Sequence, residues 1–517
     1  MTWPNARVLA SRSIEHQDIF FNIWRLAWVH HALVTSPSHL FDANQFHPEK
    51  GVLAYSDAML LESLIAAPLF AMRLPPMLIH NLLLLGAIAS SGIGMFALAR
   101  YLWRDDAAAV LAGIIFAFAP YRFAHYMHME LQWTMWIPWA FWAMHSTIDT
   151  GRVKYGVLTG LFIALQICSS IYYGIFLVVL LSIVGAVQLL RVAPGARMRT
   201  AGAFAAGAVL AIGVAAVYSK PYRDASARVG VRSIEEILEY SAKPSSYLRV
   251  PRFNYLYAQS HAGNSAELAL FPGYVPALLA VAAVALLRPS VLVMSYVLGL
   301  ALAFDLSLGL NGLIYPWLHE HVAVFKGLRA PARASIFFLL FVAALAARAC
   351  AAALPSLRLN VRLAGITAIA ALVLLEYWVA PLPLMAYPVR PAVYDFLARQ
   401  PDGVVIEFPV PRLDRLPGPD ARYVYMSIFH WKPLANGYSG YYPPSYLTRM
   451  ERMVTFPDRQ SIQQLRNDGV RYIVVHESSY IRPMEGATIV EGLAREGARP
   501  MTRLHDGWAA ATVFELR

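Results

Sequence analysis

The chain has 517 residues, of which 58% are hydrophobic and only 15% are charged. A soluble globular domain has about a quarter of its residues charged, so this composition excludes an ordinary soluble enzyme. It also excludes a disordered protein, because so much apolar surface must be buried in protein or in lipid. The net charge is +11. In a polytopic membrane protein such an excess of lysine and arginine usually lies in cytoplasmic loops and sets the orientation of the spans, so we do not take it as evidence of nucleic-acid binding.

Apolar stretches long enough to cross about 30 Å of hydrocarbon predict about ten membrane spans. The predicted spans are residues 77–100, 107–120, 131–148, 155–172, 173–190, 201–218, 271–287, 291–308, 335–353 and 363–380. The stretch 57–72 is shorter and carries Glu62, so we expect a partial or interfacial helix there. Cys168 and Cys350 lie far apart, which predicts neither a disulfide nor a metal site.

Lysine and arginine in the short connections predict the orientation of the spans. The basic segments 100–104, 152–154, 191–199 and 348–362, with Arg288, fall on one side when the spans alternate, and that side should be cytoplasmic. The opposite, periplasmic side then receives a first outer loop at residues 1–57 and the tail 381–517, on either side of a transmembrane domain at 58–380. Residues 1–5 contain no apolar signal for export, so either export relies on the later spans or, as we expect, an upstream first helix is missing from this chain.

The tail is expected to form a small α/β domain. Its strand-like runs are residues 404–408, 470–475 and 509–514, which alternate with helical runs at 393–399, 461–467 and 489–496. About 130 residues are enough for such a domain to bury a core of its own.

The first outer loop contains an acidic residue in front of an amphipathic helix. From Asp18 onward, Phe21, Trp24 and Trp28 repeat at helical spacing, and this composition suits a helix in the membrane interface. Asp18 would lie in the first turn, where the helix dipole favours a carboxylate. Asp18 is therefore either a helix cap or a functional group. The polar and aromatic segment that follows, 40–57, is either a functional loop or a solvated connector.

The predicted outer turn at 121–130 holds several polar side chains. His125 and His128 are three residues apart and could share a metal ion, but no third ligand is evident, which favours polar packing at the interface. Arg122 is a candidate for a phosphate contact, because guanidinium groups match phosphate oxygens. Glu130 begins the next span and would be costly to expose to lipid.

Two further groups on the predicted outer side could bind ligands. A cationic cluster suits a lipid-linked phosphate, or alternatively anchors the chain to headgroups; it consists of Lys326, Arg329 and Arg333. Aromatic and amide side chains in the tail suit a sugar or a lipid headgroup, or alternatively pack the loop in which they lie; they are Trp431, Asn436 and Tyr438. The sequence has no phosphate-binding Walker loop and no dinucleotide fingerprint, which argues against an ATP-driven pump.

The order of these features resembles the GT-C superfamily of integral membrane glycosyltransferases, which use polyprenyl-phosphate sugars. Protein O-mannosyltransferases and lipid A aminoarabinose transferases belong to it, and the sequence is most similar to uncharacterised bacterial members. The resemblance rests on an acidic residue before an amphipathic helix in the first outer loop and on short sequence motifs at residues 18–28 and 53–57. It also rests on the multiple spans and on the exported tail.

The resemblance implies a GT-C-like fold and an inverting glycosyltransferase of the bacterial inner membrane. It would move a sugar from a polyprenyl phosphate to an envelope lipid, glycan or protein. Asp18 matches the catalytic carboxylate, with Glu15 as the nearest alternative. Cations would bind the donor phosphate, and the residues expected to do so are Arg122, Lys326, Arg329 and Arg333. Other polar residues would contact acceptor or sugar; they are Asn22, Asp57, His125, His128, Glu130, Trp431, Asn436 and Tyr438.

The first outer loop has no Asp-x-Asp motif, so we expect no metal and no cofactor besides the donor substrate. Two other functions compete with the transferase. A transporter or flippase of lipid-linked saccharides would require ionisable residues deep in the spans and two related halves. A non-catalytic envelope assembly factor would require the tail but not Asp18.

Overall fold

In the computed structural model, the described residues are 2–263, 265–353, 358–380, 382–388, 390–480 and 483–516. They form two compact units, each built from segments far apart in the sequence. Unit 1 comprises Met1–Arg7, Leu82–Ser219 and Val231–Pro383, and unit 2 comprises Val8–Asn81, Lys220–Gly230 and Leu384–Arg517. Thus most of the predicted first outer loop and the predicted tail belong to one unit. Residue 381, where the tail is predicted to begin, lies outside the described residues.

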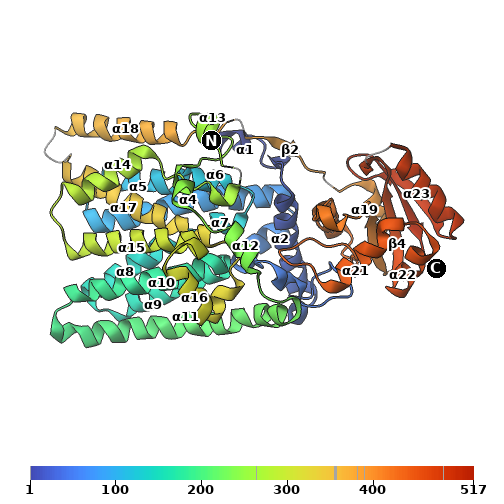
Figure 1. Cartoon of the computed structure of the whole chain (residues 1–517), viewed down its shortest axis with the longest axis horizontal. Coiled ribbons are helices and arrows are strands. Elements are labelled where there is room, and N and C mark those ends of the chain that lie inside the picture. The colour runs from blue at the N-terminus through green and yellow to red at the C-terminus, as the bar shows by residue number, and fades with distance from the viewer. Residues whose placement is uncertain are drawn as a thin grey trace. The chain divides into compact units, whose positions relative to one another are not determined.

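Unit 1 is helical, and its long helices run side by side in Figure 1. Its helices are α1 (Trp3–Ala6), α5 (Asp106–Phe118), α6 (Pro120–Ala124), α7 (Met129–Gln132), α8 (Trp136–Thr150), α9 (Val153–Ser169), α10 (Ile171–Gln188), α12 (Ile234–Glu239), α13 (Ala258–His261), α14 (Tyr274–Ala285), α15 (Val291–Leu308), α16 (Ile314–His321), α17 (Ser335–Ala353) and α18 (Leu359–Glu376). Most of α4 (Pro76–Trp103) and of α11 (Pro194–Val229) also lies in unit 1.

Among the described residues, seven helical stretches are long and apolar enough to cross a membrane. They are Pro76–Trp103, Asp106–Ala124, Ile171–Arg191, Pro194–Val229, Val291–Asn311, Pro331–Ala353 and Leu359–Glu376. The other three predicted spans, at 131–148, 155–172 and 271–287, correspond to the shorter helices α8, α9 and α14, with 15, 17 and 12 residues. The expected partial helix at 57–72 is α3 (Leu60–Ala71), which is also short and apolar.

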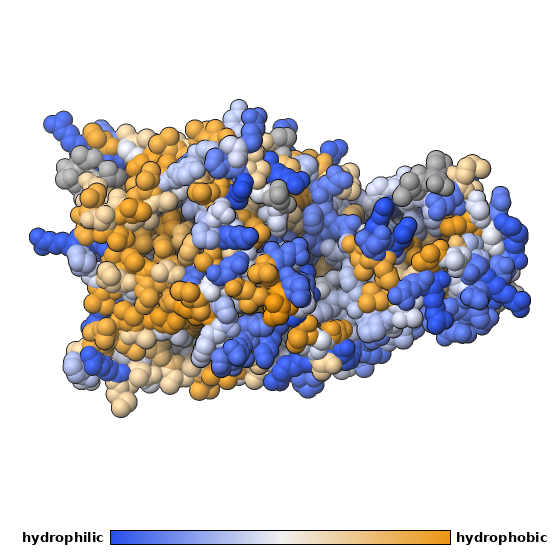
Figure 2. Space-filling model, in the orientation of Figure 1, coloured by the Kyte–Doolittle hydropathy of each residue, from blue (hydrophilic) through white to orange (hydrophobic). Residues whose placement is uncertain are grey.

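Two of the seven helical stretches leave most of their apolar surface uncovered by protein. Only 22% of the most apolar window of Pro194–Val229 and 17% of that of Leu359–Glu376 are buried, although their mean hydropathies are 2.0 and 1.7. Figure 2 shows the hydrophobic surface that spreads over the helices of unit 1. Such a surface is stable only against lipid, while the helices satisfy their own backbone hydrogen bonds. The chain is therefore a polytopic helical membrane protein.

Helix packing in unit 1 depends on small residues. The central helix α17 is 72% buried in its most apolar window and packs against α5, α14 and α15. Helices α9 and α11 approach so closely that a Cβ atom on Gly160 would lie 1.9 Å from the carbonyl oxygen of Gly207, and one on Gly207 would lie 2.0 Å from that of Gly156. Small residues at such contacts are what allow two membrane helices to pack backbone against backbone.

Unit 2 combines helices with two small sheets. Its helices are α2 (Gln17–Thr35), α3 (Leu60–Ala71), α19 (Ala392–Ala398), α20 (Asp420–Met426), α21 (Pro444–Arg452), α22 (Arg459–Asn467) and α23 (Pro483–Arg495), and its strands are β1 (Arg12–Ile14), β2 (Leu384–Ala386), β3 (Val404–Phe408), β4 (Val470–His476), β5 (Arg499–His505) and β6 (Ala510–Glu515). Strands β1 and β2 pair antiparallel and tie the N-terminal segment to the start of the tail.

The four-stranded sheet of the tail has the order β3-β4-β6-β5. Strands β3 and β4 are parallel, and β6 runs antiparallel to both β4 and β5. β3 is buried along its whole length and β4 along nearly all of it, as expected for continuous β-branched runs in a parallel pair. The predicted α/β character of the tail is confirmed, with β5 as an additional strand.

The predicted helix after Asp18 is α2, but protein covers its aromatic face. Phe21, Trp24 and Trp28 are all buried, with Trp24 completely enclosed. Trp24 Nε1 donates to Asn44 Oδ1 at 3.1 Å and Trp28 Nε1 donates to the Leu40 carbonyl at 2.8 Å. These indoles therefore bind the following segment of unit 2, and α2 is a core helix of that unit where the sequence predicts an interfacial one.

Candidate functional site

The carboxylate of Asp18 lies in the first turn of α2. Its Oδ1 atom accepts a hydrogen bond from the Tyr438 hydroxyl at 2.5 Å. Its Oδ2 atom lies 3.3 Å from Nδ1 of His16, and the Asp18 side chain is 17% exposed. The cap position of α2 belongs to His16, whose Nδ1 accepts from the Asp18 backbone N–H at 3.2 Å. The carboxylate is thus accessible to a ligand, and His16 takes the capping role that the sequence suggests for Asp18.

Tyr438 is held in place by residues of the predicted first outer loop. Its backbone N–H donates to Gln45 Oε1 at 2.9 Å, and its ring meets the Phe21 ring edge-on with 5.1 Å between centroids. Burial, and then the negative charge of Asp18, raise the pKa of Tyr438 well above its ordinary range. The hydroxyl therefore remains a hydrogen-bond donor to Asp18 at neutral pH.

Further along α2, the buried side chain of Arg25 holds the segment around Asp57. Its Nη2 donates to Asn22 Oδ1, and its Nη1 donates to the Asp57 carbonyl at 2.5 Å. The guanidinium also lies 4.6 Å from the centre of the Phe21 ring. Asn22 is completely buried, so the structure gives Asn22 and the Asp57 backbone a supporting role. Their predicted contact with acceptor or sugar stays a prediction.

A second carboxylate of unit 2, Asp420 at the start of α20, is completely buried. It accepts hydrogen bonds from the Tyr446 hydroxyl at 2.6 Å, from Asn436 Nδ2 at 3.1 Å and from the Gly437 N–H at 3.3 Å. Despite these donors, burial raises the pKa of Asp420 to about 7. Burial, and then the charges of Asp420 and Asp18, raise the pKa of Tyr442 above its ordinary range.

The predicted ligand residues of the tail differ in their surroundings. Trp431 stacks on His31 with 4.1 Å between ring centroids. Asn436 is buried, and its amide bonds the Glu407 backbone N–H and carbonyl as well as Asp420. Packing of the loop explains both residues, whereas Tyr438 reaches a partly exposed carboxylate. We call Asp18, His16 and Tyr438 the Asp18 cluster.

In unit 1, the two histidines of the predicted outer turn meet an acid. His125 follows α6 and His128 precedes α7, and their Nδ1 atoms are 3.1 Å apart. His125 Nε2 lies 3.6 Å from Oε2 of Glu267, which belongs to a short 3-10 helix, η5 (Ala266–Leu268). Arg333 donates to both oxygens of Glu267, with a shortest distance of 2.5 Å. We call these four residues the Glu267 cluster.

Charge within the Glu267 cluster is set by burial and by ion pairing. Burial lowers the pKa of His125 to about 3, so its imidazole is neutral at physiological pH. Burial alone would raise the pKa of Glu267, but Arg333 and then His125 lower it well below its ordinary range. The cluster therefore contains an ionised carboxylate beside a neutral, metal-competent imidazole.

The other three predicted phosphate-binding residues of unit 1 differ from Arg333 in burial and in partners. Arg122 is buried, and its guanidinium donates to Thr134 Oγ1, to Ser91 Oγ and to the Gln132 carbonyl. Lys326, in the 3-10 helix η7 (Ala323–Gly327), is exposed. Arg329 lies 3.6 Å from Glu236 and over the ring of Tyr240. Arg122 is enclosed by protein, so a phosphate could reach it only if the surrounding residues moved apart.

Glu15 and Glu130 are the remaining acidic residues that the sequence predicts as site candidates. Glu15 follows β1 and is exposed, whereas Glu130 lies in α7 and is buried. A role for either in catalysis or in ligand binding stays a prediction.

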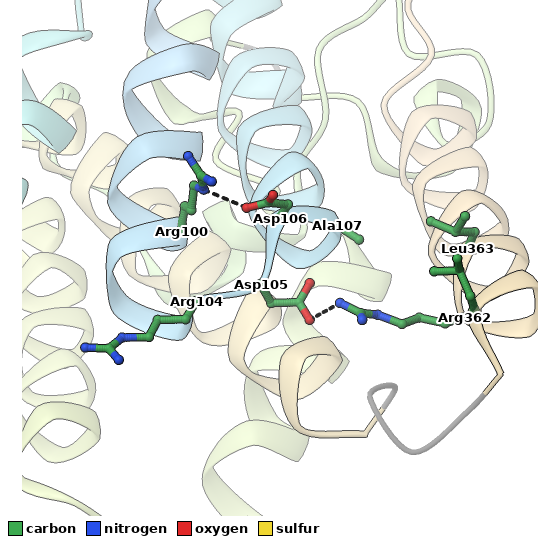
Figure 3. Close-up of a pocket in the computed structure, with 8 residues that line it drawn as sticks. Arg100, Arg104, Asp105, Asp106, Ala107, Arg362 and Leu363 are labelled. Carbon is green, nitrogen blue, oxygen red and sulfur yellow. Dashed lines mark hydrogen bonds and ion pairs between the residues drawn. The ribbon is translucent and has the colours of Figure 1, made fainter.

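A pocket of about 650 Å³ lies elsewhere in unit 1, between the ends of α4, α5 and α18 (Figure 3). Arg100 bonds Asp106 there at 2.6 Å, and Arg362 pairs with Asp105. Figure 3 shows Arg104 pointing away from both pairs. None of the predicted catalytic or binding residues lines this pocket.

A buried charge network in the tail has no counterpart in the sequence predictions. His476, at the end of β4, bonds Asp506 at 2.5 Å through Nδ1 and Glu407 at 2.7 Å through Nε2. Asp506 also accepts from Arg422 at 2.7 Å. The side chains of this network come from distant positions, and no local spacing identifies them. Because His476, Glu407 and Asp506 are almost fully enclosed, the network is a structural element of the tail.

No protein-family model matches the sequence, and no curated protein matches it either. Among solved structures, the chain is similar to the crystal structure of ArnT from Cupriavidus metallidurans in the apo state. The similarity covers 100% of this chain and 97% of that chain, with 12% sequence identity and a TM-score of 0.44. A similarity this distant assigns no activity, so the proposals below rest on the chain's own residues.

Proposed function

We propose that the chain is a membrane glycosyltransferase in which Asp18 is the catalytic base. The observation that carries this proposal is the environment of the Asp18 carboxylate, which is partly exposed, oriented by the Tyr438 hydroxyl and flanked by His16. A base for an acceptor hydroxyl or amine needs this combination of access and fixed orientation. The apolar helices of unit 1 favour substrates that reside in the membrane.

In the proposed reaction, Asp18 takes a proton from the acceptor nucleophile as that nucleophile attacks the anomeric carbon. The new bond from carbon to acceptor forms while the bond from carbon to the donor phosphate oxygen breaks. The electron pair leaves with the polyprenyl phosphate, and the configuration at the anomeric carbon is inverted. The acceptor is an envelope lipid, glycan or protein.

The departing phosphate requires cations. We propose Lys326 and Arg329 for this role, because Lys326 is exposed and Arg329 is only half-buried. Arg333 is almost fully buried and committed to Glu267, and Arg122 is committed to neutral oxygens. Both are therefore weaker candidates than the sequence suggests.

The experiment is a mass-spectrometric comparison of envelope lipids and glycans in a strain that lacks the gene. The strain is complemented with the wild-type chain, including any upstream span, with Asp18→Asn or with the control Asp414→Asn, at matched expression. Asp414 is an exposed acid of the same unit. We expect one sugar to be missing in the deletion strain and in Asp18→Asn but present with the control.

Full restoration of the envelope profile by Asp18→Asn would contradict the proposed base and would favour transport or assembly. The topology has its own test, a reporter fused after Arg517. The proposal places the tail on the periplasmic side of a bacterial inner membrane, so a cytoplasmic signal would overturn that assignment.

A further inference from the structure

We propose that His125, His128 and Glu267 bind a divalent cation of the zinc type. One possible ligand atom from each of the three lies within 4.8 Å of the others. His125 and His128 lie in the turn between α6 and α7, whereas Glu267 lies in η5, so the fold brings the acid to the histidine pair. The proposal concerns unit 1 and does not depend on the proposed transferase activity.

A rotation of the His125 ring would bring one atom from each residue close to zinc-ligand spacing. At the usual Zn–N and Zn–O lengths, ligand atoms in a tetrahedral site are ~3.4 Å apart. The His125–His128 distance is 3.1 Å and the His125–Glu267 distance is 3.6 Å. The first involves Nδ1 of His125 and the second involves Nε2, so binding requires a rotation of that ring toward one shared position.

Burial provides a second, independent observation. The His125 side chain is 0% exposed, and within the described part of the chain its Nε2 has no hydrogen-bond partner. A buried polar atom without a partner is destabilising unless a ligand satisfies it. This atom lies 3.6 Å from Oε2 of Glu267, so a cation placed between them would give it a partner.

Neighbouring residues hold the ligands in place. The Gln132 amide donates to the His125 carbonyl at 2.8 Å and fixes the turn that carries the two histidines. Arg333 bonds both carboxylate oxygens and lies over the Tyr172 ring, with 4.8 Å between the guanidinium carbon and the ring centre. Such outer contacts orient metal ligands in known sites. The orientation of Glu267 is therefore set before an ion arrives.

The charges of the site predict what the fourth ligand is. Imidazole binds a metal ion in its neutral form, so two histidines and one carboxylate supply a single negative charge, against two positive charges on the ion and one on Arg333. The remaining positive charge favours an anionic oxygen in the open fourth position, as in catalytic zinc sites that keep one position free. The sequence predicts no bound metal, in contrast to the site proposed here. The difference arises because nothing in the sequence identifies Glu267 as a third ligand.

The test uses the purified full-length chain in detergent, stripped with a chelator and titrated with ZnCl₂. We expect one equivalent of Zn²⁺ to bind, measured by calorimetry and by elemental mass spectrometry. Affinity should fall by at least ~10-fold in His128→Asn and in Glu267→Gln. It should not change in His321→Asn, which replaces an exposed histidine of the same unit.

Cobalt provides a readout that does not depend on the stability of a ligand-deleted variant. Co²⁺ bound to the wild-type chain should give the visible absorption of a tetrahedral site. His128→Cys, which retains a ligand, should shift that absorption by adding a thiolate transition. If wild-type chain binds no Zn²⁺, or if His128→Asn and Glu267→Gln bind it as the wild type does, the cluster is only an ion pair and the proposal is wrong.

Discussion

The hydroxyl of Tyr438 donates a hydrogen bond to the carboxylate of Asp18, although 420 positions separate the two residues in the chain. A tyrosine of the tail thereby determines the orientation of the acid at the start of α2. A hydrogen bond to a charged group contributes about 1.5–3 kcal/mol, which is enough to affect a reaction that depends on that group.

Tyr438→Phe should lower kcat by about 10- to 100-fold with little change in KM, because it removes the donor that orients the base but no substrate contact. The measurement is sugar transfer in membranes that contain equal amounts of each variant. Tyr255→Phe, which alters an exposed tyrosine of unit 1, is the control. In an Asp18→Asn background the same change should add almost nothing, and an additive loss would show that Tyr438 acts independently of Asp18.

Asp420 should make the stability of unit 2 decrease as the pH rises. Burial raises its pKa from 3.8 to about 7, so between these values the folded chain keeps a proton that the unfolded chain has released. This contribution is complete below about pH 4 and is lost as the pH rises through 7. Asp420→Asn should flatten the dependence of the unfolding temperature on pH over that range. An unchanged slope in the variant would assign it to other groups.

The buried histidine of the tail should contribute at higher pH. Burial alone would lower the pKa of His476, but its bonds to Asp506 and Glu407 raise it above 6.5. Stability from this residue is therefore complete below pH 6.5 and is lost as the pH rises through the raised pKa. At pH 6, below the raised pKa, His476→Gln removes the positive charge between two buried carboxylates and should cost about 3–5 kcal/mol. Chemical unfolding of the purified chain measures this loss, and a loss below about 1 kcal/mol would contradict a charged His476.

The contact between α9 and α11 should not tolerate even one methyl group at Gly207. Gly207→Ala would place a Cβ atom 2.0 Å from the Gly156 carbonyl oxygen, so we expect a lower yield and a lower unfolding temperature in detergent. Gly213→Ala on the same helix meets nothing within 4 Å, and it should be neutral or slightly stabilising because alanine favours helix. Equal behaviour of the two variants would mean that the helices do not pack as described.

Local patterns in the sequence predicted local structure well. The aromatic spacing after Asp18 predicted α2 almost to its first residue, and the apolar runs of the tail predicted β3, β4 and β6. Apolar composition was a weaker guide to helix ends. Phe271 and Pro272 are apolar but precede Gly273, whose φ of 90° prevents a helix from starting earlier, so α14 is shorter than the predicted span.

The candidate sites were predicted only in part, because side-chain contacts between distant segments leave no periodic signal. Asp18 and Tyr438 were both candidates, but nothing in the sequence connects them. The histidine pair was recognised without Glu267, and Arg333 was interpreted as a phosphate ligand without its carboxylate partner. The GT-C-like arrangement and the side of the membrane stay predictions.

Unit 2 is assembled from segments at both ends of the chain, and this affects how the chain folds during its synthesis. Its N-terminal segment is complete early in translation, yet Tyr438 emerges 420 residues after Asp18, which at ribosomal speeds is about 20–80 s later. During this interval the aromatic face of α2 lacks its final partners while the helices of unit 1 enter the bilayer. A nascent chain that stops before the tail would thus expose Phe21 and its neighbours, a state that quality-control proteases and chaperones could recognise.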